Sequence, residues 1–173
     1  MPTAQDFIQL KAFARQDALV LGGLWMASFA LVVMAPQSMM GTLLALSTPV
    51  LLGWLLSRFR DVALDGVISF RRGYVYCVYC FLYASLLFAV AQYVYFRFID
   101  GGRFMQMLSE SVKLVEQAYQ QNGLSTAEFQ PMLEQMQSLP PSQWVFMLLM
   151  QNLFIGFVLG VPVAAVCARK VKQ

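Results

Sequence analysis

The chain has 173 residues, of which 59% are hydrophobic and only 12% are charged, and its net charge is +3. Water-soluble domains usually have about a quarter of their residues charged. The composition therefore excludes an ordinary soluble domain and predicts an integral membrane protein. Long unbroken apolar runs also disfavour a membrane β-barrel, whose strands alternate between apolar and polar residues.

The first long apolar run extends from Ala18 to Ser57 and contains no Asp, Glu, Lys, Arg or His. One helix of that length would measure about 60 Å, roughly twice the hydrocarbon thickness of a bilayer. Pro36 interrupts the run near its middle, which indicates two spanning helices at about 17–35 and 39–57.

Two further charge-free runs follow, and each has the roughly 20 apolar residues that a spanning helix needs. They predict spans at about 73–96 and 142–168. We therefore expect one all-α membrane domain over residues 1–173, with four transmembrane helices and a helical hairpin inserted between spans three and four.

Residues 1–16 precede the first span and show no cleavable signal sequence. Phe7, Ile8, Leu10 and Phe13 fall largely on one side of a helix, which indicates an interfacial lead-in helix. A simple extension of the first span explains the pattern equally well.

The basic residues are distributed unevenly over the two sides that four spans define. Nine of the 12 Lys and Arg residues fall on the side of the two termini and the 58–72 link, including Lys11, Arg15, Arg169, Lys170 and Lys172. The positive-inside rule then places both termini in the cytoplasm and the 97–141 connection outside.

Small residues form a stripe in the fourth span. Gly156 and Gly160 make a G-x-x-x-G that Ala164 continues, and such a stripe allows another helix to approach closely. Packing inside one four-helix bundle is the interpretation we favour, and a homo-oligomer interface is the alternative.

Among the polar residues within the predicted spans, three are candidates for functional contacts: Gln92, Gln151 and Asn152. Unpaired polar groups are costly in hydrocarbon, so these residues need partners. Hydrogen bonds between spans three and four are the favoured explanation, and a polar substrate path is the alternative.

The 97–141 connection is patterned as two helices. An amphipathic helix is predicted over about 102–121 from the spacing of Met105, Leu108, Val112, Val115 and Tyr119. Asn122-Gly123 should end it with a left-handed cap. Ser125 to Glu128 read as a capping box that begins a second helix, although Pro131 favours a kink or a start one turn later. The apolar stripe of this hairpin fits ordinary packing or a partner surface.

Four arginines lie in or beside the inner link, and they are candidates for binding lipid headgroups or phosphates: Arg58, Arg60, Arg71 and Arg72. The same residues also fit a simple topology signal.

Cys77 and Cys80 form a C-x-x-C inside an apolar span, and Cys167 is the only other cysteine. A zinc site normally needs four ligands and the chain has no histidine, so we expect no metal and no cofactor. No nucleophile motif, P-loop or dinucleotide fingerprint occurs, so we expect no catalytic residues, no enzyme activity and no nucleic-acid partner.

Three short motifs resemble a family of bacterial membrane proteins, the domain of unknown function four-one-nine-nine. They are Gly66-Val67-Ile68-Ser69-Phe70, Tyr95-Phe96-Arg97-Phe98-Ile99-Asp100 and Gly123-Leu124-Ser125. The resemblance implies four spans with a basic tail and transfers no catalytic residues. It also implies a partner, because such proteins are often encoded beside a membrane glycosyltransferase that acts on polyprenyl phosphate.

These observations predict a non-enzymatic accessory or scaffold protein of the inner membrane, whose partners are membrane lipids and a membrane protein or a second copy. The alternative is a small translocator of a lipid-linked or amphipathic substrate, in which Gln92, Gln151 and Asn152 would line the path.

Overall fold

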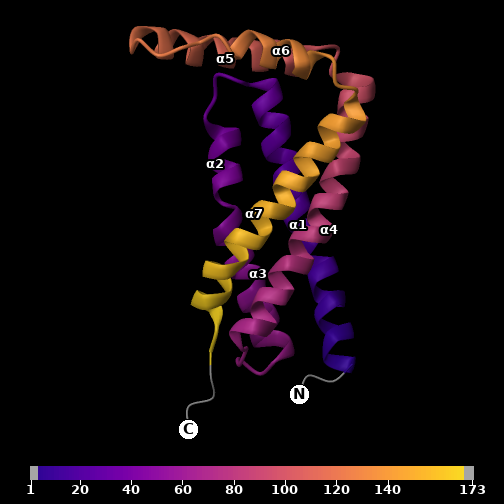
Figure 1. The fold of residues 1–173 in the computed structure, drawn as a ribbon. Coiled ribbons are helices and arrows are strands. Elements are labelled where there is room, and N and C mark those ends of the chain that lie inside the picture. Colours follow the sequence, from indigo (N-terminus) through magenta and orange to yellow (C-terminus); the bar gives the residue numbers. More distant parts are fainter. Residues whose placement is uncertain (1–3, 170–173) are drawn as a thin grey trace. The chain divides into compact units, whose positions relative to one another are not determined.

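A computed structural model describes residues 4–169 of the chain. Among these residues the backbone is helical apart from turns, and the only extended pairing is one antiparallel bridge between Ile68 and Arg169. The elements are α1 (Ala4–Met34), α2 (Met40–Leu46), α3 (Thr48–Ala63), α4 (Phe70–Val94), the π-helix η1 (Tyr95–Ile99), α5 (Arg103–Gln121), α6 (Phe129–Gln137) and α7 (Pro141–Cys167) (Figure 1).

Four helical segments are long and apolar enough to cross a membrane: Gln5–Met34, Met40–Ala63, Phe70–Ile99 and Pro141–Cys167. The prediction of an all-α protein with four spanning helices is therefore confirmed, and the chain is a multi-pass membrane protein. The predicted ends at about residues 17, 57 and 73 lie inside longer helices, because charged residues at a membrane edge do not stop a helix. Residues 1–3 of the predicted lead-in helix, and Lys170 and Lys172 of the basic tail, lie outside the described residues.

The first helix is longer than the span predicted for it. α1 runs without interruption from Ala4 to Met34, so residue 4 onward of the expected lead-in segment and the first span form one helix. Its 31 residues correspond to about 46 Å of helix, which matches a bilayer including its headgroups better than the hydrocarbon alone.

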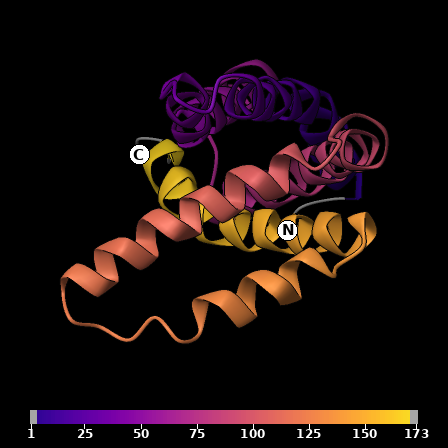
Figure 2. The same cartoon turned by 90° about the horizontal axis from the view of Figure 1, so that it is seen from above.

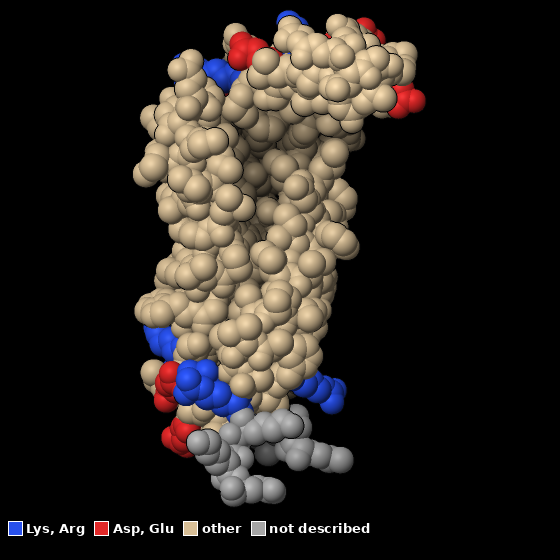
Figure 3. Space-filling model, turned by 90° about the vertical axis from the view of Figure 1, so that its left-hand side faces the viewer, with Lys and Arg blue, Asp and Glu red and all other residues tan. Residues whose placement is uncertain are grey.

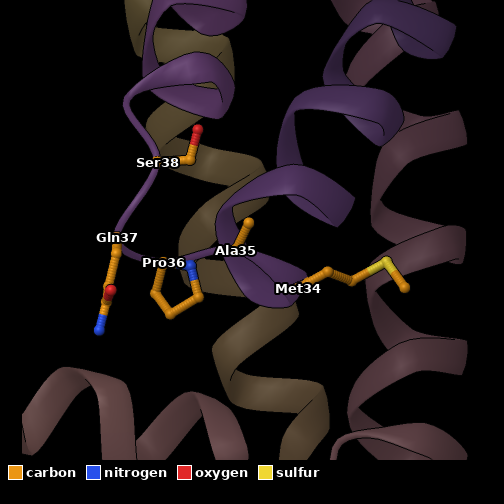
Figure 4. Close-up of a pocket in the computed structure, with 5 residues that line it drawn as sticks. All are labelled: Met34, Ala35, Pro36, Gln37 and Ser38. Carbon is orange, nitrogen blue, oxygen red and sulfur yellow. The ribbon is translucent and has the colours of Figure 1, made fainter.

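A tight turn connects α1 to α2. The backbone N–H of Ser38 donates to the carbonyl oxygen of Ala35 at 2.9 Å, and a surface pocket is lined by the five consecutive residues Met34 to Ser38. Figure 4 shows Met34 and Gln37 pointing to opposite sides of this turn. The pocket is therefore formed by the shape of the turn itself.

The second span is interrupted at Ser47, where the sequence had predicted one helix. α2 ends at Leu46 and α3 begins at Thr48, with Pro49 in its first turn, where a missing N–H breaks no helical hydrogen bond. The joint is held by α1, because the indole N–H of Trp25 donates to the hydroxyl of Thr48 at 3.0 Å. Near the start of α2, the Ser28 hydroxyl donates to the carbonyl oxygen of Gly41 at 2.7 Å.

The chain divides into two compact units. One consists of Met1–Ala91 with Met147–Gln173, and the other is Gln92–Phe146. This division does not test the prediction of a single membrane domain, which stays a prediction.

In the first unit, α4 and α7 meet along a line of small residues. A Cβ atom added to Gly156 would lie 2.5 Å from the ring of Phe81, and one added to Gly160 would lie 3.3 Å from the ring of Tyr74. One turn beyond, a Cβ on Gly73 would lie 3.6 Å from the Cβ of Ala164. We call Gly73, Gly156, Gly160 and Ala164 the small-residue seam. These residues let the spanning helices α4 and α7 approach each other closely.

In the second unit, α5 and α6 run side by side, as Figure 2 shows from above. The rings of Tyr119 and Phe129 pack edge to face at 5.2 Å, and the Gln130 amide donates to Glu116 at 3.0 Å. Gly123 has φ +70°, and the N–H of Leu124 donates to the carbonyl oxygen of Tyr119 at 3.0 Å, which closes the C-terminus of α5.

The start of α6 agrees with the predicted alternative of a start one turn later, and the capping box at Ser125 is wrong. The helix begins at Phe129, one turn after Ser125, and its N-cap residue Glu128 makes no side-chain cap. Pro131 explains the shift, because a start at Phe129 places this proline in the first turn, where its missing N–H is harmless.

Candidate functional site at the charged end of the spanning helices

One carboxylate is buried in the interior of the first unit. One face of α1 is formed by four residues at spacings of three and four: Leu10, Ala14, Asp17 and Leu21. All four are buried, and Asp17 is only 1% exposed. Burying a carboxylate is unfavourable unless it is paired, so its neighbours determine whether this position is stable.

Two polar side chains from other helices reach Asp17. The Tyr76 hydroxyl of α4 donates to Oδ2 at 2.5 Å, and Nη2 of Arg58 on α3 lies 3.7 Å from Oδ1. Tyr76 is fully buried and stacks on Phe59 with the ring centroids 4.8 Å apart. We call Asp17, Arg58 and Tyr76 the Asp17 cluster; it links α1, α3 and α4.

Arg58 differs from its two partners in the cluster because it is partly open to solvent or headgroups. Its side chain is 38% exposed, and its guanidinium lies 5.9 Å from the ring centroid of Trp54. Trp54 is itself exposed, so the pair fits a membrane edge where a polar tip meets an apolar body.

Arg60 is bonded inside the protein. Its guanidinium makes two hydrogen bonds to Asp61, at 2.7 and 3.0 Å, and a third to the carbonyl oxygen of Cys167 at 3.1 Å. The third bond satisfies a carbonyl at the end of α7, where a cation also interacts well with the helix dipole. Arg60 therefore ties α3 to α7.

The last two arginines lie at the start of α4. Arg72 forms an ion pair with Asp6 of α1 at 3.3 Å. The Arg71 side chain is exposed and makes no hydrogen bond or ion pair with another described residue. On the face drawn in Figure 3, charged side chains gather at the lower end of the spanning helices, below a broad surface without Lys, Arg, Asp or Glu. Headgroup binding by Arg58, Arg60, Arg71 and Arg72 stays a prediction, and the structure shows that three of them also have a carboxylate partner.

The three cysteines are free and buried. The Cys167 thiol donates to the carbonyl oxygen of Gly53 at 3.5 Å and lies 3.6 Å from the Ser57 hydroxyl. Within residues 4–169, no group of three or more His, Cys, Asp or Glu is arranged to hold a metal ion. The cysteines thus occupy packing positions in the helices.

The predicted polar contacts of spans three and four are placed in different units. Gln92 is 3% exposed, and its Oε1 has no hydrogen-bond partner in the described part of the chain. Gln151 is exposed and Asn152 is half-buried. Their hydrogen bonding to one another stays a prediction.

The Asp17 cluster can hold helices together and can compensate a buried charge. Two surface pockets of the unit are lined by residues 34–38 and by Ala12, Phe13, Arg15, Gln16 and Leu19, and neither includes a residue of the cluster. Asp17 and Tyr76 were not among the residues predicted from the sequence, because Asp17 directly precedes the charge-free run that begins at Ala18. The spacing of Leu10, Ala14, Asp17 and Leu21 would have placed Asp17 on the buried face.

Comparison with protein families finds a match over residues 16–169 to the family described as Protein of unknown function (DUF4199). No curated protein and no solved structure matches the chain.

Proposed function

Because this chain belongs to the DUF4199 family, whose description assigns no activity, we propose a function from its own residues: a non-enzymatic accessory or scaffold protein of the bacterial inner membrane. Its partner is a second membrane protein that binds the α5–α6 unit. The expected candidate is a glycosyltransferase that acts on polyprenyl phosphate, and a second copy of the chain is the other possibility to test.

The observation that carries this proposal is the surface of α5 and α6. The two helices pack against each other, yet large apolar side chains of the helices and of the turn between them are exposed: Leu114 at 67%, Val115 at 45%, Leu124 at 56% and Met132 at 39%. Exposed apolar groups on a small pair of helices with capped ends are typical of surfaces that bind another protein. Methionine adds an adaptable side chain to that surface.

The ends of α5 support a surface that is formed before any partner arrives. Asp100 accepts hydrogen bonds from the N–H groups of Gly102, at 3.1 Å, and Phe104, at 2.9 Å, at the N-terminus of the helix. Gly123 closes the other end. A surface with fixed ends loses less conformational entropy when it binds.

Site-specific photo-crosslinking in cells tests the scaffold function. A photoreactive residue at Leu114 should give one discrete protein adduct, which mass spectrometry identifies. Val50, an exposed apolar residue of α3, is the matched control and should give lipid adducts. The same adducts at both positions, or no protein adduct at Leu114, would contradict the proposal.

The translocator is the second candidate. The buried Oε1 of Gln92 favours it, because it has no hydrogen-bond partner within residues 4–169 and such a polar group fits a substrate path. Gln92→Leu removes that group. A translocator should lose transport of its lipid-linked substrate while the chain stays folded, whereas a scaffold should keep its Leu114 adduct.

The proposed orientation has both termini in the cytoplasm, which the nine-to-three distribution of the 12 basic residues supports. Because the native cysteines are buried, single cysteines introduced at Arg71 and Lys113 can be labelled against little background. A membrane-impermeant maleimide added outside the inner membrane should label Lys113→Cys and leave Arg71→Cys unmodified. Labelling of Arg71→Cys without labelling of Lys113→Cys would show the opposite topology.

A further inference from the structure

The basic residues at the charged end of the first unit fall into two groups. Arg58, Arg60 and Arg72 each have an aspartate partner. Lys11, Arg15, Arg71 and Arg169 are exposed and form no ion pair within residues 4–169. Positive charges that the protein leaves uncompensated are available to an anion from outside the chain.

Lys11 and Arg15 lie one turn apart on the same side of α1. Like charges at this spacing destabilise a helix when nothing lies between them. An anion that contacts both side chains would remove this repulsion. Their arrangement therefore favours a ligand with a single negative group, such as a phosphate.

Aromatic rings surround the Lys11 ammonium. Nζ lies 5.6 Å from the centroid of Phe7 and 5.3 Å from that of Tyr79, and the two rings meet edge to face at 6.4 Å. These cation–π contacts hold Lys11 against α4 without neutralising its charge. Phe and Tyr side chains beside a cation are typical of the headgroup level of a membrane.

The length of α1 places the pair at that level. The charge-free part of the helix, Ala18–Met34, has about the length of the hydrocarbon core, at roughly 1.5 Å per residue. Lys11 and Arg15 precede it by one to two turns and therefore lie among the headgroups. Arg15 also lines a surface pocket with Phe13 and Leu19, whose apolar side chains suit an acyl chain.

We propose that Lys11 and Arg15 bind the phosphate of an anionic phospholipid, with Phe7 and Tyr79 packed beside its headgroup. This lipid site differs from the four link arginines considered above and does not depend on the scaffold function. Phosphatidylglycerol is a suitable probe, because it bears one phosphate and a net negative charge, whereas phosphatidylcholine has the phosphate but no net charge.

Native mass spectrometry of the purified full chain tests the site. The protein is released from mixed micelles of phosphatidylglycerol and phosphatidylcholine, and the ratio of the two retained lipids is measured. Each basic residue near an anionic surface strengthens association about fivefold, so Lys11→Gln with Arg15→Gln should lower the retained ratio roughly 25-fold. Lys11→Arg with Arg15→Lys should restore most of it.

The matched control removes the same charge from the other unit. Arg103→Gln with Lys113→Gln should leave the retained ratio unchanged. An equal loss in both double variants would show an effect of net charge alone and would overturn the site, as would no loss in either. Displacement of phosphatidylglycerol by millimolar inorganic phosphate would assign the residues to a free phosphate instead of a lipid. The melting temperature of each variant confirms that the chain is folded.

Discussion

The two contacts that α4 makes inside the first unit are built in different ways. Toward α1 and α3 it presents Tyr76, which stacks on Phe59 and donates a hydrogen bond to the buried Asp17. Toward α7 it presents Tyr74 and Phe81 to the glycines of the small-residue seam. The first contact depends on the direction of polar groups. The second depends mainly on how closely the helices approach, because the hydrogen bond from the Tyr74 hydroxyl to the carbonyl oxygen of Phe157 is long, at 3.5 Å. Different substitutions should therefore break them.

Asp17→Ala should have the largest effect. It leaves the Tyr76 hydroxyl without its acceptor and Arg58 without its partner. The lost ion pair with Arg58 contributes less to the destabilisation, because the Arg58 side chain is partly exposed. We expect the free energy of unfolding to fall by about 3 kcal/mol. Unfolding of the detergent-solubilised chain by sodium dodecyl sulfate, followed by circular dichroism, measures the change.

Asp17→Asn is the matched control, because the amide keeps an acceptor oxygen for Tyr76 and removes only the charge. Its free energy of unfolding should fall by less than half of the decrease expected for Asp17→Ala. A wild-type unfolding midpoint for Asp17→Ala would show that the cluster does not hold the helices together.

Gly156→Ala should come next, and it tests the seam. The new Cβ would lie 2.5–2.7 Å from three atoms of the buried Phe81 side chain, so α7 must move away or Phe81 must leave its position. Overpacking of this kind costs about 2 kcal/mol. Gly23→Ala is the control, because nothing lies within 4 Å of its added Cβ. The same unfolding assay compares them, and equal midpoints would contradict close approach at Gly156.

Tyr76→Phe separates the two parts of the polar contact. The ring still stacks on Phe59, whereas the hydrogen bond to Asp17 is lost. We expect a decrease of about 1.5 kcal/mol in the free energy of unfolding, in the range for a hydrogen bond to a charged group. In the double variant with Asp17→Ala the loss should be less than additive. Full additivity would show that the two residues do not act together.

The sequence predicts the spanning helices well because hydropathy is a property of each segment alone. It does not predict the Asp17 cluster, because Asp17, Arg58 and Tyr76 are brought together only by the packing of three helices. The break at Ser47 has the same origin: Ser47-Thr48-Pro49 permits a joint, but the bond from Trp25 to Thr48 holds it in place. The small-residue seam is predicted in part. The sequence shows the stripe of small residues on α7, but it does not show which residues of α4 pack against that stripe.

Thr48→Val should have the smallest effect and extends the comparison into the apolar part of the bundle. Valine has nearly the shape of threonine, so the substitution removes the acceptor of the Trp25 indole N–H and leaves that N–H buried without its partner. Hydrogen bonds between membrane helices average about 0.6 kcal/mol, with a maximum of about 1.7, so we expect a loss of about 1 kcal/mol. Thr42→Val on α2 is the control, because this threonine is exposed. A loss at Thr48 as large as that of Asp17→Ala would mean that the α2–α3 joint, and not the charged end, is the main polar link between α1 and α3.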